Sequence, residues 1–341
     1  MALNLIKNIR KFSLKNRRVF VIALVIVSLW IFGLGTGMKI IALSLAAWYV
    51  WAFGLGVWSG RLLAEGSLSK FPDIEKTDRV LILAPHIDDE IIACAGIIQE
   101  TISVGAKILI VYATNGDNHL ASVLGKNTTF DPNDFIDLGE KRMIEAGKAT
   151  AALGLTQKDS IFLGYPDCGL NHMLYHFFDS ETSYTSAGTR FNYNPYKGTY
   201  REKQLYTGAN LAADLNEIVD KFKPTIAIVP HPRDNNLDHK SLFYLWEKVI
   251  NEKSAEPSQY AYLIHFGFYP LERKLKQDDF LYPPKKLFSQ EGWHSFDLLP
   301  EQVEKKLEAV NKNASQLRTI DASAFFLRNF VRQNEIFEKI E

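Results

Sequence analysis

The residues best suited to chemistry lie directly after two apolar stretches of the chain. Two groups of histidines and carboxylates share this position: His86, Asp88, Asp89 and Glu90 in LILAPHIDDE, and His231, Asp234, Asp238 and His239 in IAIVPHPRDNNLDHK. Imidazole and carboxylate ligands together suit zinc, with iron(II) or manganese as alternatives. A bound divalent ion lowers the pKa of its water from roughly 15.7 towards about 7 and polarises a carbonyl oxygen. The two groups therefore indicate a metal-dependent hydrolase, and this chemistry suits an amide substrate.

Two short apolar runs are predicted to position these groups. Residues 79–85 and 225–230 contain V-L-I-L-A and I-A-I-V, and runs of this length bounded by turn residues are typical of buried strands. In an open α/β sheet, ligands bind outside the carboxyl ends of the strands. If both strands lie in one parallel sheet, His86, Asp89 and His239 converge on one cation and leave a fourth position open for water.

Asp88 is the candidate general base of such a site. It is adjacent in sequence to Asp89 but need not point at the cation, so it could accept the water's proton and return it to the departing amine. The alternative is an ordinary polar loop with an acidic helix start, since Asp and Glu favour helix N-termini. The second group at an equivalent strand end favours the metal site.

These residues resemble a known family, the PIG-L/LmbE-like de-N-acetylases. Its first motif reads approximately A-H-P-D-D-E, and this chain has APHIDDE, with Ile87 in place of proline. Further segments resemble the family in the same order along the chain: TNGD, GEKRMIEAGKATAALGL, FLGYPDCGL, and then ASQLR and NEIFEKI, which resemble its closing helices. The resemblance runs from about Val80 to the C-terminus. It implies a Rossmann-like fold and a zinc-dependent hydrolase that removes acetyl groups from N-acetylglucosamine-type sugars.

The resemblance also implies roles for individual residues. By motif position, the metal ligands are His86, Asp89 and His239, and Asp88 is the base. A separate pair, Arg142 and Asp167, matches family positions that contact the sugar or its attached group. For Arg142 the alternative is an i,i+3 pair with Glu145 on a solvated helix face.

One departure from the family concerns the residue three positions before the last ligand. The family usually has a second histidine there, and this chain has Asn236. The role thought to fall to that histidine is to stabilise the oxyanion or protonate the leaving group. Asn236 can still donate an amide hydrogen bond to an oxyanion, and His231 could reach in from the start of the same loop. Alternatively, His231 is a strand-end histidine bonded to Asp234.

The N-terminal part of the chain is basic and apolar. Residues 1–64 contain eight Lys or Arg and no Asp or Glu, and they include uncharged apolar runs of 20 residues (19–38) and 19 residues (40–58). About 20 residues are needed for a helix to cross roughly 30 Å of hydrocarbon. We therefore predict a two-helix transmembrane hairpin. Six basic residues before the first span predict a cytoplasmic N-terminus. Two membrane crossings then leave the catalytic part on the cytoplasmic face, whereas a single crossing would place the catalytic part outside.

The predicted domain organisation follows from these boundaries. It comprises a basic cytoplasmic N-terminus (1–18), two transmembrane helices (19–59), a linker (60–78) and a PIG-L/LmbE-like catalytic domain (79–341). The chain has 39 basic and 39 acidic residues, so residues 65–341 carry 31 basic against 39 acidic and are not suited to nucleic acid. A membrane anchor favours a lipid-linked or otherwise membrane-associated amino sugar, although a soluble conjugate stays open. The sequence does not indicate an oligomeric state.

The catalytic domain is predicted to be α/β, with a layered, mostly parallel sheet. Predicted strands span 79–85, 107–114, 160–164 and 225–230, with 259–268 as an edge strand. Predicted helices span 90–103, 135–153, 208–222, 239–251, 300–313 and 322–340. Two long irregular segments, 167–206 and 269–299, have the length of functional loops, and the first could close over the substrate.

The remaining histidines and cysteines suggest little chemistry. His172 and His176 have the i,i+4 spacing of helical metal ligands, but no third partner is evident. The other histidines outside the two groups, His119, His265 and His294, are expected to be satisfied polar groups. Cys94 and Cys168 are too isolated for a disulfide framework and are expected to be buried.

Two other classes of function stay open. The missing motif histidine allows a catalytically silent carbohydrate-binding or scaffold protein, although binding alone does not need Asp88. The same ion could also hydrolyse a different amide, an ester or a phosphate.

Overall fold

The computed structural model describes two units of the chain. It describes residues 35, 41, 43–51, 68–119, 122–123, 131–253, 256–267, 269–270, 275–288, 292–317 and 323–340. The units are Met1–Trp58 and Ser59–Glu341. In the first, residues 41 and 43–51 are helical, and most of the two predicted membrane spans lies outside the described residues. Over the described ranges, no helix has both the length and the apolar character needed to cross a membrane.

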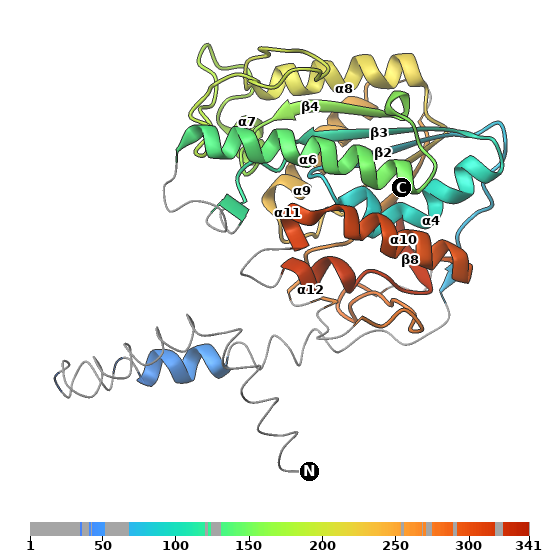
Figure 1. Ribbon diagram of the computed structural model, residues 1–341. Coiled ribbons are helices and arrows are strands. Elements are labelled where there is room, and N and C mark those ends of the chain that lie inside the picture. The colour runs from blue at the N-terminus through green and yellow to red at the C-terminus, as the bar shows by residue number, and fades with distance from the viewer. Residues whose placement is uncertain are drawn as a thin grey trace. The chain divides into compact units, whose positions relative to one another are not determined.

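An eight-stranded, mostly parallel sheet forms the centre of the second unit (Figure 1). The strands are β1 (Ser69–Lys70), β2 (Arg79–Ala84), β3 (Lys107–Thr114), β4 (Ser160–Tyr165), β5 (Ile226–Pro230), β6 (Ser258–Tyr262), β7 (Trp293–Asp297) and β8 (Asn334–Ile340). Their order in the sheet is β1-β7-β8-β6-β5-β2-β3-β4, and β8 is antiparallel to both of its neighbours. The predicted α/β class and mostly parallel sheet are confirmed.

Helices cover both faces of this sheet. They are α4 (Asp89–Ser103), α6 (Pro132–Ala152), α7 (Leu170–Tyr175), α8 (Gly208–Phe222), α9 (Leu237–Ile250), α10 (Pro300–Lys312), α11 (Ala314–Leu317) and α12 (Ser323–Arg328), with a short 3-10 helix, η1 (Gln157–Asp159). The core beneath α4, α6 and α10 contains Val80 and Ile82, whereas the core beneath α8 and α9 contains Leu81 and Leu83. Successive strand residues point to opposite faces, so β2 is apolar throughout because both of its faces are buried.

The sheet reverses its strand order beside β2. From β2 the chain adds β3 and β4 on one side, and it then returns to place β5 on the other side, where Val80 pairs with Ile226 and Ile82 with Ile228. Loops that leave parallel strands at such a switch point diverge and open a crevice. The loops after β2 and β5 therefore open at the same edge of the sheet.

The C-terminal segment differs from the prediction. Helix α12 lies within the predicted helix 322–340, but Asn334–Ile340 forms β8, so the likeness of NEIFEKI to a closing helix is wrong. This segment fills the gap between β6 and β7, and Ile336 and Phe337 are buried in the core. Strand β6 is consequently internal rather than the predicted edge strand, and β7 lies within a segment predicted to be irregular. Sheet pairing decided these strands, and local sequence patterns do not reveal it.

Candidate active site

Three potential ligand atoms meet at the switch point of the sheet. Nε2 of His239 lies 3.3 Å from Nδ1 of His86 and 3.3 Å from Oδ2 of Asp89, and the latter two atoms are 3.5 Å apart. Zinc bonds of about 2.0–2.1 Å in tetrahedral geometry place neighbouring ligand atoms about 3.3–3.4 Å apart. The structure therefore brings the three predicted ligands together at spacings that fit one zinc ion.

Local structure fixes the positions of these ligands. The backbone N–H of His86 donates to Oδ2 of Asp89 over 2.9 Å, and Asp89 is the first residue of α4. The turn after β2 thereby holds two ligands next to each other. His239 lies in the first turn of α9, where it is fully buried.

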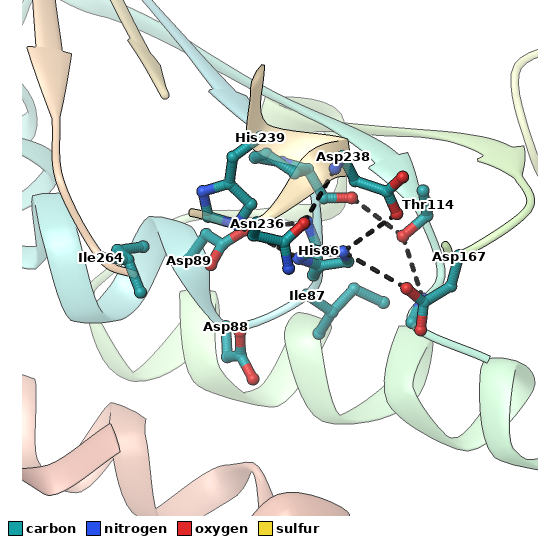
Figure 2. A network of polar contacts seen from close by, with 12 residues as sticks. His86, Ile87, Asp88, Asp89, Thr114, Asp167, Asn236, Asp238, His239 and Ile264 are labelled. Carbon is teal, nitrogen blue, oxygen red and sulfur yellow. Dashed lines mark hydrogen bonds and ion pairs between the residues drawn. The ribbon is translucent and has the colours of Figure 1, made fainter. Parts of the chain in front are cut away.

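Buried carboxylates hold the other ring nitrogen of each histidine. Nε2 of His86 lies 3.3 Å from Oδ1 of Asp167 and 3.3 Å from Oδ2 of Asp238, while Nδ1 of His239 lies 3.2 Å from Oδ2 of Asp234. Figure 2 shows His86 between the other two ligands and the carboxylates of Asp167 and Asp238. Metal-binding histidines commonly donate a hydrogen bond from the N–H of their second ring nitrogen to a carboxylate, which fixes the ring and its tautomer.

A second set of possible ligands, His86, Asp167 and Asp238, shares one histidine with the first. Both oxygens of Asp238 already accept backbone N–H groups, from Cys168 over 2.6 Å and from Leu170 over 3.1 Å. One oxygen of Asp167 accepts from the N–H of Asn118 over 3.0 Å. These carboxylates are therefore better suited to orient His86 than to bind the ion.

The electrostatics of the site favour a cation. Burial lowers the pKa of both imidazoles, but the surrounding carboxylates outweigh it, raising the pKa of His86 well above its ordinary value and that of His239 to about 9. Burial raises the pKa of Asp89, but the two histidines hold it well below its ordinary value. A divalent ion bound by these groups would displace the imidazole protons, because histidine binds a metal only in its neutral form.

Asp88 adopts a strained backbone beside the ligands. Its φ of 115° lies in the left-handed region, which non-glycine residues adopt at an energetic cost that is often found at functional sites. Its Oδ2 lies 3.2 Å from Nη2 of Arg142. Burial raises the pKa of Asp88 while Arg142 opposes the rise, and the result is a pKa of about 7. A general base works best with a pKa near the operating pH.

Arg142 is buried on α6 and points into the site. Its guanidinium donates to the carbonyl oxygens of Gly116, over 2.8 Å, and Ile87. The alternative of a solvated pair with Glu145 is wrong, because that carboxylate accepts from the backbone N–H of Ser315 over 3.0 Å. A Cβ atom at Gly116 would lie 2.1 Å from Nη1 of Arg142, and the φ of Gly116 is +62°. Glycine in TNGD therefore makes room for the guanidinium.

A cavity of about 510 Å³ opens onto the site. Beside His86 and Asp89, its polar lining residues include Asp88, Arg142, Asp167 and Asn236. Its apolar lining residues include Ile92, Ile264, Phe326 and Leu327. A polar group bearing an apolar substituent could therefore reach the base and the ligands together.

Comparison with known proteins identifies the family. Residues 81–250 match the family model of PIG-L, described as GlcNAc-PI de-N-acetylase. The chain therefore contains a PIG-L family domain. It is accordingly a metal-dependent hydrolase of amide bonds and a deacetylase of the PIG-L/LmbE type. No curated protein matches the sequence.

Three solved structures are similar to this PIG-L protein. A deacetylase triple mutant from the teicoplanin biosynthetic pathway is 16% identical, with a TM-score of 0.48, covering 76% of this chain and 97% of its own. N,N'-diacetylchitobiose deacetylase from Pyrococcus horikoshii is 17% identical, with a TM-score of 0.47, and the match covers 76% of this chain and 83% of that deacetylase. The A40926 pseudoaglycone deacetylase is 15% identical, with a TM-score of 0.49, and the match covers 77% of this chain and 96% of that deacetylase.

The PIG-L motif residues at and near position 236 have distinct environments. Asn236 lines the cavity and caps α9, its Oδ1 accepting from the N–H of Asp238 over 2.8 Å. His231 does not line the cavity. Its Nε2 lies 2.5 Å from Oε2 of Glu338, and its ring stacks on Trp293. The structure therefore gives His231 the strand-end position; its carbonyl oxygen accepts from the N–H of Asp234 over 3.0 Å, but its side chain pairs with Glu338 instead of Asp234.

The sequence analysis named Asp234 without predicting its role in this PIG-L site, and it did not place His265 there. Asp234 serves His239 rather than His231, and His265 lines the cavity with its ring centroid 4.9 Å from that of His239. Burial and the neighbouring His239 lower the pKa of His265 to about 4. The available signal was position, since His265 follows β6 as His86 follows β2.

Other expectations have mixed outcomes. Cys94 is buried as predicted, but Cys168 is exposed and lines the cavity, so its predicted burial is wrong. His172 and His176 lie on and just after α7, and neither belongs to a possible metal-binding group among the described residues.

Proposed function

We propose that this protein uses zinc to remove the acetyl group from an N-acetylglucosamine-type sugar that is linked to a lipid. The observation that carries the proposal is the set of three donor atoms, 3.3–3.5 Å apart, at the edge of a cavity that Asp88 also lines. A site for binding alone needs no strained carboxylate beside the ligands. The base therefore supports hydrolysis over a silent carbohydrate-binding role.

The residues of the site suit each part of amide hydrolysis. A divalent ion held by the three ligands would lower the pKa of water and polarise the amide carbonyl. Asp88 takes one proton from water as the water oxygen bonds to the acetyl carbon. It then gives that proton to the sugar nitrogen as the carbon–nitrogen bond breaks, which leaves a free amine and acetic acid; the acid releases its remaining proton to become acetate. Arg142 keeps the Asp88 carboxylate in place and favours its charged form.

The cavity supports a sugar with an apolar attachment. Arg142 and Asp167 are the candidate contacts for sugar hydroxyl groups, since both line the cavity. The apolar lining residues suit the acetyl methyl group and the beginning of a lipid aglycone, because burial of such groups is favourable.

The N-terminal sequence supports a membrane location. Residues 1–64 lack acidic side chains and contain apolar runs of 20 and 19 residues, each close to the length of a membrane-spanning helix. In this proposal two spans anchor the protein, and the catalytic domain lies on the cytoplasmic face. An anchor of this kind raises the concentration of the active site near lipid-linked substrates.

Acetate release from two matched substrates tests this function. The full-length protein in detergent is given an N-acetylglucosaminyl lipid or a soluble N-acetylglucosaminide, with and without a chelator. We expect chelation to stop acetate release from both, added zinc to restore it, and the lipid to be the better substrate. Asp88→Asn should be inactive, whereas Asp220→Asn, whose side chain is exposed, should match the wild type. Chelator-resistant turnover would contradict the mechanism, and preference for the soluble sugar would contradict the lipid linkage.

A further inference from the structure

Amide hydrolysis needs a hydrogen-bond donor for the carbonyl oxygen. When water adds to the acetyl carbon, that oxygen becomes negative, and fixed N–H groups aimed at it lower the barrier. His231 cannot serve, because its ring pairs with Glu338 outside the cavity. Asn236 lines the cavity, and because its Oδ1 caps α9, its Nδ2 is the atom that would donate to a carbonyl oxygen. Besides the ligand His86, the imidazoles of His119 and His265 line the cavity; Nδ1 of His119 pairs with Oγ of Ser122, whereas the ring of His265 contacts the ligand His239.

The topology places His265 at the same edge of the sheet as the ligands. Strand β6 runs parallel to β5, with Tyr262 paired to Pro230, so the loops after both strands open together. The backbone N–H of His265 donates to Oδ2 of Asp234 over 2.9 Å. The same oxygen lies 3.2 Å from Nδ1 of His239. One buried carboxylate therefore fixes both a ligand and the backbone of His265.

The ring of His265 is held on two sides. It lies nearly perpendicular to the ring of His239, at 77° with 4.9 Å between centroids. It stacks on Phe326 at 10° with 5.2 Å between centroids. Phe326 also lines the cavity, and it lies beyond the residues 81–250 that match the PIG-L model, as does His265. The C-terminal part of the chain thus supplies an oriented imidazole to the site.

We propose that His265 is a catalytic residue that donates a ring N–H hydrogen bond to the carbonyl oxygen of the scissile amide. The inference rests on the amide hydrolysis proposed above. A neutral imidazole carries one N–H and a charged one carries two, so this role requires no proton transfer by His265.

Two substitutions separate the hydrogen bond from the packing. His265→Phe keeps an aromatic ring against Phe326 but removes the N–H, and His265→Gln keeps an N–H donor. We expect His265→Phe to lower kcat by about 100- to 1,000-fold, the usual loss for one oxyanion donor. His265→Gln should lose less, and KM should change little in both. Each variant should bind zinc as the wild type does, measured by metal analysis of the purified protein.

A tetrahedral analogue provides a second readout. A methylphosphonamidate in place of the acetamide mimics the charged intermediate, so its affinity should fall with kcat in His265→Phe, while affinity for the acetamide is retained. His172→Phe is the control, since His172 is exposed and outside the cavity, and it should match the wild type.

Several results would overturn the inference. A wild-type kcat in His265→Phe would be one. Loss of bound zinc from His265→Phe, or an equal fall in the affinities of this variant for the analogue and for the acetamide, would indicate a structural role for His265. If the wild type binds zinc but releases no acetate from either substrate, the proposed function fails, and this inference fails with it. If the wild type is active and His265→Phe equals it, only this inference fails.

Discussion

Replacing Asp234 with asparagine should weaken zinc binding without changing any ligand. The Asp234 side chain is fully buried and joins the two loops of the site. Its Oδ1 accepts from the N–H of Asn236 over 2.8 Å, and its Oδ2 accepts from the N–H groups of Ile264, over 3.2 Å, and His265, over 2.9 Å. Oδ2 also faces Nδ1 of His239.

The magnitude follows from these contacts. The least costly orientation of asparagine turns its amide nitrogen towards the N–H of Asn236, which leaves this backbone donor and the new amide N–H groups facing one another without an acceptor. Each buried donor left unpaired costs about 1–3 kcal/mol of stability. In this orientation an oxygen still faces Nδ1 of His239, but the negative charge that raises the basicity of this ligand is lost. Loss of such a partner typically weakens metal affinity by about 10- to 100-fold, or about 1.4–2.7 kcal/mol.

Zinc competition titration and urea unfolding of the metal-free protein measure the two effects separately. Asp234→Asn should lower both zinc affinity and the free energy of unfolding. The control is Asp220→Asn, which removes a carboxylate that pairs with Lys253 at the surface and should change neither. An Asp234→Asn protein with wild-type zinc affinity would refute the idea that this carboxylate orients His239.

Three further predictions concern the base and the ligands. Gly116→Ala places a Cβ atom 2.1 Å from Nη1 of Arg142, so the guanidinium must move away from Asp88. We expect kcat to fall by about 100-fold in steady-state assays, and an unchanged kcat would contradict this prediction. Burial raises the pKa of Asp88 and the Arg142 cation opposes this rise, which leaves a pKa of about 7. Arg142→Met removes that cation, so the pKa of Asp88 should rise and the acid limb of the kcat/KM profile should move to higher pH. Movement of this limb to lower pH would contradict the pairing of Asp88 with Arg142. The pKa of His239 is about 9 in the metal-free protein, so zinc must displace its proton in order to bind. Calorimetry should therefore show proton release, and zinc affinity should rise about tenfold per pH unit for each displaced proton between about pH 6 and pH 8. A zinc affinity that is independent of pH would contradict this protonation state.

The sequence was most informative where short-range patterns carry the structure. The apolar runs that became β2 and β5 are each buried on both faces, so they could be recognised as strands of a parallel sheet. The rule that sites lie at the carboxyl ends of such strands then placed His86, Asp89 and His239 close together, and the structure brings their donor atoms within 3.3–3.5 Å.

Long-range contacts were not predictable in the same way. β8 forms because a gap between β6 and β7 accepts it, and nothing within Asn334–Ile340 identifies that gap. The direction of Arg142 depends on a glycine 26 positions earlier, at Gly116. His265 became visible as a site residue only once β6 was found to lie beside β5. In each case the deciding partner lies far away in the sequence.

Zinc titration of the metal-free enzyme, followed by acetate release, tests the central role of His86, Asp89 and His239 most directly. Our account predicts no turnover without metal and a linear recovery that saturates at one equivalent of zinc per chain, with no recovery in His239→Ala. Full turnover in the metal-free protein, or recovery in His239→Ala equal to that of the wild type, would contradict it.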